Sequence, residues 1–327
     1  MKVLVTGATG YVGSHLIPAL LKGGQKVRAL VLPGEEDARL RSLGVEIFFG
    51  DLRDESSLLA ALCGMEICYH LAGINRFWIP RVRDYYEINV EGVRRLLKAA
   101  QRARVRRVVH TSSAVTIGEK KGEIGKEETP HRGYFLSHYE RSKYLGEREA
   151  LAMGGPGLEV VVVNPTSAYG PGRTEGSGKV FLDLVRGRLP GFFGTFINLL
   201  FIEDMVRGHL VAAEKGRSGQ RYILAGENLT MEETVAAAAE EAGLPQIPER
   251  IPTPLVWAIS WVGHLRSLFT GHPPRLPRDQ VRTLLHGICV DASKARRELG
   301  MEFTPFREGL ARTMEGYREA GLIATPA

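Results

Sequence analysis

Two side chains four residues apart, Tyr139 and Lys143, could together exchange a proton with an alcohol or a carbonyl group. They lie in a stretch with helical character, and residues i and i+4 share one face of a helix. A phenol has a reference pKa of about 10, and a nearby ammonium group favours its deprotonated form. The pair therefore predicts acid–base chemistry at an oxygen atom. The same spacing also fits a solvent-exposed amphipathic helix, so the pair needs a site around it.

A hydroxyl group at the end of an apolar run could help to bind that oxygen atom. Ser113 follows the run that begins at Arg107 and reaches Thr111. In open parallel sheets, binding sites lie beyond the carboxyl ends of the strands, where Ser113 would then be. A serine-rich strand end is also common outside active sites.

Three glycines near the N-terminus indicate a phosphate-binding turn. Gly7, Gly10 and Gly13 follow an apolar run that ends near Val5, and a helical pattern begins at Ser14. A strand, a glycine turn and a helix start are the arrangement that a dinucleotide pyrophosphate requires, because the free N–H groups of the helix start face the phosphates. A glycine triplet alone is weak evidence, since many turns use glycine.

The elements that must position these residues alternate between strand and helix through the first half of the chain, which favours a parallel sheet with crossover helices. Strands are expected at 27–32, 45–49, 67–71, 107–111 and 159–163, and helices at 55–62, 84–103 and 137–153. Strands are also expected at 199–202 and 221–224, and the chain beyond residue 230 is mostly helical. We expect a dinucleotide-binding domain over 1–163, with 195–226 returning to its sheet, and a substrate domain over 164–194 and 227–327.

Composition and charge exclude several classes of protein. The 327 residues are 44% hydrophobic and 24% charged, as in ordinary globular proteins. The net charge of +6 comes partly from a basic cluster that lacks interleaved aromatic residues, so it predicts a solvated helix face and no nucleic-acid partner. No uncharged apolar stretch reaches the length of roughly 18 residues that a membrane span needs, so stable membrane insertion is not expected. The cluster comprises Arg94, Arg95, Lys98, Arg102, Arg104, Arg106 and Arg107.

Three cysteines, Cys63, Cys68 and Cys289, are too few and too irregularly spaced for a disulfide framework or a metal site. The N-terminus runs directly into a strand, without the pattern of a signal peptide. A cytoplasmic location and no bound metal are therefore expected.

Taken together, the glycine turn, the strand-end serine and the Tyr-x-x-x-Lys pair resemble the extended short-chain dehydrogenase/reductase family over nearly the whole chain. The resemblance implies a Rossmann-type, doubly wound parallel sheet with a smaller, mainly helical C-terminal substrate domain. It implies that Ser113, Tyr139 and Lys143 are catalytic and that Asn89 holds a water in the proton relay. The cofactor residues that it implies are Gly7, Thr9, Gly10, Tyr11, Val12, Gly13, Arg28, Asp51, Leu52, Leu71, Ala72, Gly73, Thr111, Tyr139, Lys143, Pro165, Thr166 and Ser167.

Within that family, the chain is similar to hopanoid-associated sugar epimerases, which in turn resemble dihydroflavonol 4-reductases. The similarity rests on the segments 72–78, 138–143 and 226–230. The substrate residues expected from this comparison and from the composition of the segments are Phe77, Trp78, Ser113, Arg173 and Lys179.

Two departures from the family pattern limit what the resemblance implies. Family members that prefer NAD usually carry an acid at the end of the second strand, and those that prefer NADP often carry an arginine there, but this chain has Val31 and Leu32. The choice between NAD and NADP therefore stays open, with Arg28 the nearest strand arginine. Sugar dehydratases carry an Asp-Glu pair where this chain has Ser112 and Ser113, which argues against dehydration.

The main functional hypothesis is an NAD(P)-dependent oxidoreductase with Tyr139 as acid or base, acting on an apolar or phenolic carbonyl. The alternative is an NAD-dependent nucleotide-sugar epimerase, for which Arg173, Lys179, Arg186, Arg221 and Arg275 could bind the diphosphate. A nucleotide-sensing regulatory protein is a remote third hypothesis, because such relatives typically lack the Tyr or the Lys. A homodimer is expected through the 84–103 and 137–153 helices. The apolar segment 254–269 could be a core helix, a lid or a membrane-facing surface.

Overall fold

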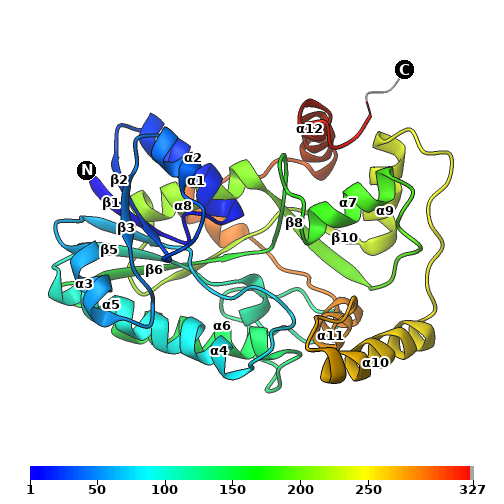
Figure 1. Cartoon of the computed structure of the whole chain (residues 1–327), viewed down its shortest axis with the longest axis horizontal. Helices are drawn as coiled ribbons and strands as arrows, with labels where there is room; N and C mark the ends of the chain where they lie inside the picture. The colour runs from blue at the N-terminus through cyan, green and yellow to red at the C-terminus, as the bar shows by residue number, and fades with distance from the viewer. Residues whose placement is uncertain (325–327) are drawn as a thin grey trace.

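A seven-stranded parallel sheet forms the centre of the first half of the protein, as a computed structural model that describes residues 1–324 shows (Figure 1). The strand order is β3-β2-β1-β4-β5-β6-β9, which is the doubly wound arrangement expected from the sequence. The strands are apolar because helices cover both faces of the sheet. Their bounds are β1 Lys2–Thr6, β2 Lys26–Val31, β3 Glu46–Phe49, β4 Ile67–His70, β5 Arg107–Thr111, β6 Glu159–Pro165 and β9 Arg221–Leu224.

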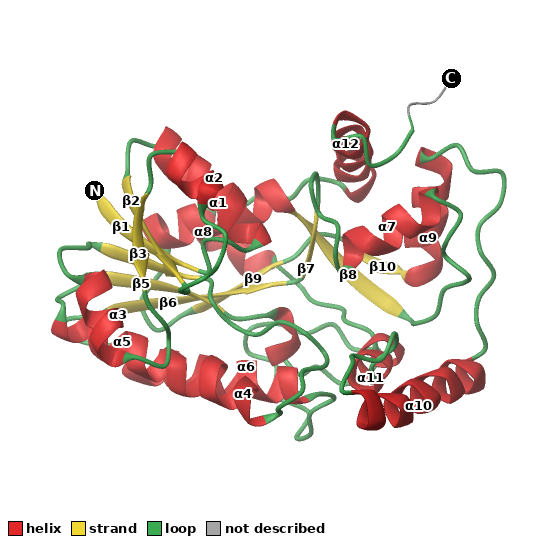
Figure 2. Ribbon diagram, viewed as in Figure 1, coloured by secondary structure: helices red, strands yellow, loops and turns green. Residues whose placement is uncertain are grey.

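Two helical layers enclose this sheet (Figure 2). On one face, α1 (Tyr11–Lys22) packs beside α8 (Ile202–Lys215), and their apolar side chains join one hydrophobic core. On the other face, α3 (Glu55–Leu62), α5 (Gly92–Arg102) and α6 (His138–Met153) enclose a second core. The short helix α2 (Ala38–Ser42) lies between β2 and β3. The sheet is thus buried on both sides, and its strand ends are left to form a site.

A separate three-stranded sheet belongs to the second half of the chain. It has the order β10-β8-β7, with β7 at Ser167–Tyr169, β8 at Phe196–Phe201 and β10 at Asn228–Thr230. The strand expected near 199–202 is therefore present as β8, but it pairs with β7 and β10, whereas β9 extends the large sheet. The helices α7 (Ser177–Val185), α9 (Met231–Glu241) and α12 (Phe306–Glu319) pack around this small sheet.

Two further helices lie at the edge of the molecule (Figure 1). The apolar segment expected at 254–269 forms α10 (Thr253–Thr270), and α11 (Arg278–His286) packs against it. Most of the large apolar side chains of α10 are exposed, so it is not a core helix. Farther along this mostly helical part of the chain, Ala295–Leu299 forms a π-helical turn.

A second π-helical turn interrupts the helix expected at 84–103. The chain forms α4 (Arg83–Tyr86), then a π turn at Glu87–Glu91, and then α5. Gly146 of α6 faces this turn so closely that a Cβ atom there would lie 1.9 Å from the carbonyl oxygen of Asn89. Single π turns often occur at functional sites, and this one contains the expected catalytic residue Asn89.

Most of the basic cluster of the first half lies at the surface, where several members form ion pairs. Arg94 binds Glu91 and Glu149. Arg95 and Arg102 also bind glutamates. Arg107 is the exception to the expected solvated face, because it is buried and binds Glu159 and the carbonyl oxygen of Ala213.

The three cysteines are all free thiols. Over residues 1–324, no helix has both the length and the apolar character needed to cross a bilayer.

Candidate active site

The glycine turn connects β1 to α1 and brings the backbone close to a second loop. Gly7 has a φ of +67°, and a Cβ atom there would lie 2.8 Å from the backbone nitrogen of Ala72. At Gly13, a Cβ atom would lie 2.5 Å from the carbonyl oxygen of Gly7. Gly10 precedes α1 and supplies no side chain to cap it. The N–H groups at the start of α1 are therefore left to bind an anion such as a pyrophosphate.

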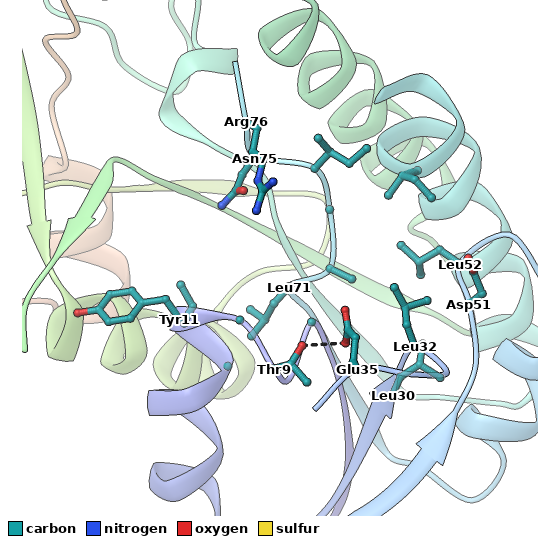
Figure 3. Close-up of a pocket in the computed structure, with 18 of the residues that line it drawn as sticks. Thr9, Tyr11, Leu30, Leu32, Glu35, Asp51, Leu52, Leu71, Asn75 and Arg76 are labelled. Atoms are coloured by element: carbon teal, nitrogen blue, oxygen red, sulfur yellow. Dashed lines mark hydrogen bonds between the residues drawn. The ribbon is translucent and has the colours of Figure 1, made fainter. Parts of the chain in front are cut away.

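A groove of about 590 Å³ runs past this turn (Figure 3). It passes between the turn, the loop after β3 and the loop after β4. The close backbone packing at Gly7 and Gly13 and the uncapped helix start fit such a ligand. The expected residues that line the groove are Gly7, Thr9, Gly10, Tyr11, Val12, Gly13, Asp51, Leu52, Leu71, Ala72 and Gly73.

At the far end of the groove, Asp51 forms an ion pair with Arg53 at 2.5 Å. A hydrogen bond from Arg53 holds the pKa of Asp51 below its usual value. Asp51 therefore stays an acceptor in the groove, as the cofactor contact implied by the resemblance requires, and Leu52 lines the groove beside it.

Glu35 also lines this groove, although it is not among the residues predicted from the sequence. Its N–H group donates to the carbonyl oxygen of Leu32 at 3.1 Å, and Gly34 has a φ of +88°, so the chain turns back after β2. Figure 3 shows the Glu35 carboxylate facing Thr9, whose hydroxyl donates to it at 2.9 Å. The Pro33-Gly34 dipeptide is the signal that could have predicted this turn. An acid is therefore present after the second strand, but in the following loop.

Arg28 does not line the groove, which corrects its expected role in cofactor binding. Its guanidinium donates to the carbonyl oxygens of Ala61 and Cys63, at 2.7 and 3.1 Å, and pairs with Glu46 at 2.8 Å. Arg28 lies three residues before the end of β2, and three strand residues span about 10 Å. Its side chain therefore stabilises the end of α3 instead of reaching the strand ends.

A second cavity, of about 260 Å³, continues the groove at the ends of β5 and β6. Val12, Leu71 and Gly73 line both cavities, so the two form one continuous site. The structure brings the expected catalytic trio together here, although the serine and the Tyr-Lys pair come from separate segments of the chain. The expected residues lining this cavity are Ser113, Tyr139 and Lys143, together with Thr111, Pro165, Thr166 and Ser167.

Burial controls the acid–base properties of the trio. It raises the pKa of Tyr139, and a hydrogen bond with Ser113 opposes that increase. It lowers the pKa of Lys143 to about 8, and the negative charge of Glu147 opposes that decrease. The Lys143 ammonium donates to the carbonyl oxygen of Thr111 at 2.7 Å. In the chain alone, burial thus outweighs any lowering of the Tyr139 pKa by Lys143, contrary to the sequence-based expectation.

Asn89 anchors the loop that follows β4. Its amide nitrogen donates to the carbonyl oxygen of Ile74 and to the hydroxyl of Ser142, both at 2.9 Å, and its oxygen accepts from the N–H group of Ile74 at 2.8 Å. Both amide protons are therefore occupied. The side chain holds the loop over the catalytic cavity, and one lone pair of its oxygen is left for the water that the resemblance implies.

A buried carboxylate supports the strand end that carries Ser113. One oxygen of Glu147 accepts from Ser112 at 2.5 Å, from Thr116 at 2.7 Å and from Asn164 at 2.6 Å. The other oxygen binds Arg221 of β9 at 2.8 Å. Glu147 is almost fully buried, so its charge depends on these partners. The network holds Ser112 and Thr116, on either side of Ser113, in place.

Buried histidines lie beneath the same strand ends. The Thr111 hydroxyl bonds Nε2 of His209 at 2.8 Å, while Nδ1 of His209 donates to the carbonyl oxygen of Met205 at 2.7 Å. Burial lowers the pKa of His209 to about 4. His70 and His110 are buried side by side, with ring centroids 5.2 Å apart, and burial also lowers their pKa values. All three imidazoles are therefore neutral near pH 7.

The four expected substrate residues other than Ser113 lie in different places. Phe77 lines the catalytic cavity, and its ring packs edge-on against Tyr139 with centroids 5.8 Å apart. Trp78 lines a neighbouring cavity instead. Arg173 lines both parts of the continuous site, with its guanidinium 4.8 Å from the Tyr11 ring. Lys179 is exposed on α7, pairs with Asp183 and lines neither cavity of the site, so the structure does not bring it together with the other expected residues.

Comparison with known proteins connects this site to one family. A sequence model described as the NAD dependent epimerase/dehydratase family matches residues 3–225. The chain is 35% identical to "Sterol demethylase protein B" of Methylococcus capsulatus, over 99% of this chain and 100% of that protein. It is 32% identical to a "Putative dihydroflavonol 4-reductase" of Synechocystis, over 98% of this chain and 96% of that protein.

A solved structure shares the fold over the whole length. The dTDP-glucose 4,6-dehydratase DesIV of Streptomyces venezuelae, solved with NAD bound, has a TM-score of 0.78 and 26% sequence identity. The similarity covers 99% of both chains. A bound NAD in a protein of this fold agrees with the dinucleotide groove.

Proposed function

This chain belongs to the NAD-dependent epimerase/dehydratase family and is an NAD(P)-dependent oxidoreductase of the extended short-chain dehydrogenase/reductase type. From this membership we propose that it interconverts a ketone and a secondary alcohol on an apolar molecule. The bound dinucleotide supplies or accepts the hydride. The Tyr139 hydroxyl gives a proton to the substrate oxygen during reduction and takes it back during oxidation. Ser113 donates a hydrogen bond to the same oxygen, and Lys143 holds a positive charge beside it.

The lining of the catalytic cavity is the observation that carries the apolar assignment. The cavity contains no carboxylate, and its only cations over the described chain are Lys143 and Arg173. Four of the five basic residues that could have bound a diphosphate lie elsewhere: Arg221 binds Glu147, Arg186 binds a carbonyl oxygen, Lys179 binds Asp183, and Arg275 is on the surface. The apolar side chains that line the cavity are Val12, Leu71, Ile74, Phe77, Val115, Met205 and Ile288.

We propose NAD, not NADP, as the preferred cofactor. Glu35 places a carboxylate in the dinucleotide groove, where it can accept hydrogen bonds from ribose hydroxyls and would repel a 2′-phosphate. The arginines nearby in the sequence have other partners: Arg39 donates to a backbone carbonyl oxygen, Arg41 binds Asp37, and Arg53 binds Asp51. Two of these guanidinium groups, those of Arg41 and Arg53, are therefore already paired with carboxylates and are less available to neutralise the additional phosphate of NADP.

The test measures net oxidation of cofactor. Purified protein is offered NADH and NADPH with a panel of ketones that runs from short and polar to polycyclic and long-chain. Consumption of NADH with apolar ketones, and much less with polar ones, supports the proposal. Freshly prepared protein is also denatured, and the released nucleotide is measured. Stoichiometric NAD in the supernatant, with interconversion of nucleotide sugars and no net consumption of NADH, would instead favour the epimerase.

We also propose that the protein forms a homodimer through α5 and α6. A second proposal is that it is located in the cytoplasm. On α6, Tyr144 and Leu145 are half-buried within one chain, so apolar surface remains there for a partner. The three free thiols suit a reducing compartment. Light scattering at micromolar concentration should report twice the chain mass of 36.0 kDa. A particle of one chain mass would refute the dimer.

A further inference from the structure

The helix α10 buries small polar residues and exposes large apolar ones, the reverse of the usual arrangement for a surface helix. Its buried residues are Val256, Ser260 and Ser267. Phe269 is 89% exposed, and Val262 and Leu268 are 68% and 67% exposed. The exposed face, which we call the α10 face, comprises Leu255, Ile259, Trp261, Val262, Leu265, Leu268 and Phe269.

Internal contacts hold this face outward. The Ser260 hydroxyl donates to the carbonyl oxygen of Leu276 at 3.0 Å, which ties the inner side of α10 to the segment that follows it. A Cβ atom at Gly263 would lie 3.3 Å from Pro274, so the segment packs closely on the helix. The apolar exposure is therefore built into the way α10 is attached. A continuous apolar face of this kind marks an interaction site.

The charge along this part of the chain is entirely positive. No Asp or Glu occurs between Glu249 and Asp279. Arg266 and Arg275 are exposed, and neither forms an ion pair with a carboxylate among residues 1–324. Arg278 stacks on the Trp261 ring at 3.7 Å, where it adds a third cation at the edge of the face. Exposed apolar and aromatic side chains next to unpaired arginines are complementary to a bilayer surface with anionic headgroups.

A cavity behind this helix leads toward the catalytic site. It has a volume of about 580 Å³ and is lined by Leu268 and His264 of α10 and by Trp78 of the loop after β4. Phe77 lines both this cavity and the catalytic cavity, and its ring contacts Tyr139. The intervening cavity thus shares Leu268 with the α10 face and Phe77 with the catalytic cavity.

We propose that the α10 face is a docking site for an anionic lipid surface, on which the protein lies without crossing the bilayer. Leu265 and Phe269, one helical turn apart, enter the boundary between headgroups and acyl chains, and Arg266 and Arg275 contact the anionic headgroups. Each arginine near such a surface strengthens binding roughly fivefold. The proposal goes beyond the enzymatic function, because attachment to lipid does not require turnover.

Flotation with lipid vesicles tests this docking directly. The full-length protein is mixed with vesicles of phosphatidylcholine alone, or of phosphatidylcholine with phosphatidylglycerol, and the fraction that floats is measured at low and high salt. We expect the protein to float with the anionic vesicles, and to float less at high salt. Leu265→Ser combined with Phe269→Ser should weaken this binding at least tenfold. Arg266→Gln combined with Arg275→Gln should weaken it on anionic vesicles only.

The matched control replaces two exposed apolar residues elsewhere, Leu43→Ser and Ile124→Ser, and should float like the unchanged protein. Thermal unfolding and NADH binding should be unaltered in all variants, since none of these side chains is buried. Failure of the unchanged protein to float, or equal flotation of the Leu265/Phe269 variant, would overturn the proposal. If the Leu265/Phe269 variant lost self-association in light scattering but still floated with vesicles, the α10 face would be assigned to a second copy of the chain.

Discussion

Replacing Glu35 with glutamine should change the cofactor preference of this enzyme. The substitution keeps the size of the side chain and the contact with Thr9, but it removes the negative charge from the dinucleotide groove. With the charge present, NAD gains a charge-assisted hydrogen bond, and NADP meets electrostatic repulsion. Without it, both effects disappear, so NADH should bind more weakly and NADPH more tightly.

The magnitude follows from charge and exposure. Two unit charges 4 Å apart interact by about 1 kcal/mol in water, and a 2′-phosphate carries close to two charges, so relief of repulsion amounts to about 2 kcal/mol. The glutamine oxygen can still accept a hydrogen bond from the ribose, and replacing a charge-assisted bond with a neutral one costs NADH about 1 kcal/mol. The ratio of the two affinities should therefore shift by roughly 150-fold at low salt, and by less at physiological salt because Glu35 is exposed.

Fluorescence titration of NADH and NADPH, at two ionic strengths, measures both affinities without a substrate. The matched control is Glu36→Gln, which removes the same charge from the adjacent exposed residue outside the groove. The control should leave the ratio within about twofold. If the ratio in Glu35→Gln equals that of the unchanged protein, or if Glu36→Gln shifts it as much, the role given to Glu35 is refuted.

Three further predictions concern the catalytic strand ends. Tyr139→Phe should lower turnover at least 10²-fold while NADH affinity is kept, because acid–base help is worth roughly 10²–10⁴-fold; turnover near that of the unchanged enzyme would exclude Tyr139 as the proton donor. Glu147→Gln should reduce the free energy of unfolding, measured by urea denaturation, by about 3–5 kcal/mol, because Arg221 loses its buried partner. The control is Glu149→Gln, which alters a more accessible ion pair on the same helix and should change the free energy of unfolding by less than about 1 kcal/mol. Neutral His209 contributes stability that is present above pH 6.5 and is lost as the pH falls toward its pKa of about 4 in the folded protein. His209→Gln should therefore reduce the loss of unfolding free energy between pH 7 and pH 5 by roughly 2 kcal/mol. An unchanged pH dependence would contradict this assignment.

The sequence was sufficient for the large sheet because its signals are local. Apolar runs separated by helical patterns predict buried parallel strands wherever they occur, and the glycine turn marks where the sheet begins to bind ligand. The membership of β8 in the small sheet could not be predicted in this way. Its apolar pattern is compatible with either sheet, and its pairing with β7 and β10 depends on contacts with segments that are distant along the chain on both sides.

The candidate site shows the same division between local and distant causes. Tyr139 and Lys143 were predictable because one helix sets their spacing. The prediction for Arg28 was wrong because Arg28 lies in β2 but three residues before its end, so its side chain binds the end of α3 and not the groove at the strand ends. Glu35 was missed because a two-residue turn carries it back to the groove. The π turn at Asn89 depends on the close approach of Gly146, from a helix much later in the chain, which no local pattern encodes.

The position of β9 in the large sheet has a consequence for synthesis on the ribosome. Arg221 is synthesised only after the whole segment from Thr166 to Gln220, yet β9 pairs with β6 and its first residue neutralises Glu147. At a synthesis rate of about 5–20 residues per second, this delay lasts roughly 3–11 s. During this delay, the nascent chain exposes the hydrogen-bonding edge of β6, which is a template for pairing with other chains. Glu147 also has no Arg221 to neutralise its carboxylate during this time. The dinucleotide groove can thus be completed early, whereas the strand end that carries Ser113 is secured only when β9 emerges.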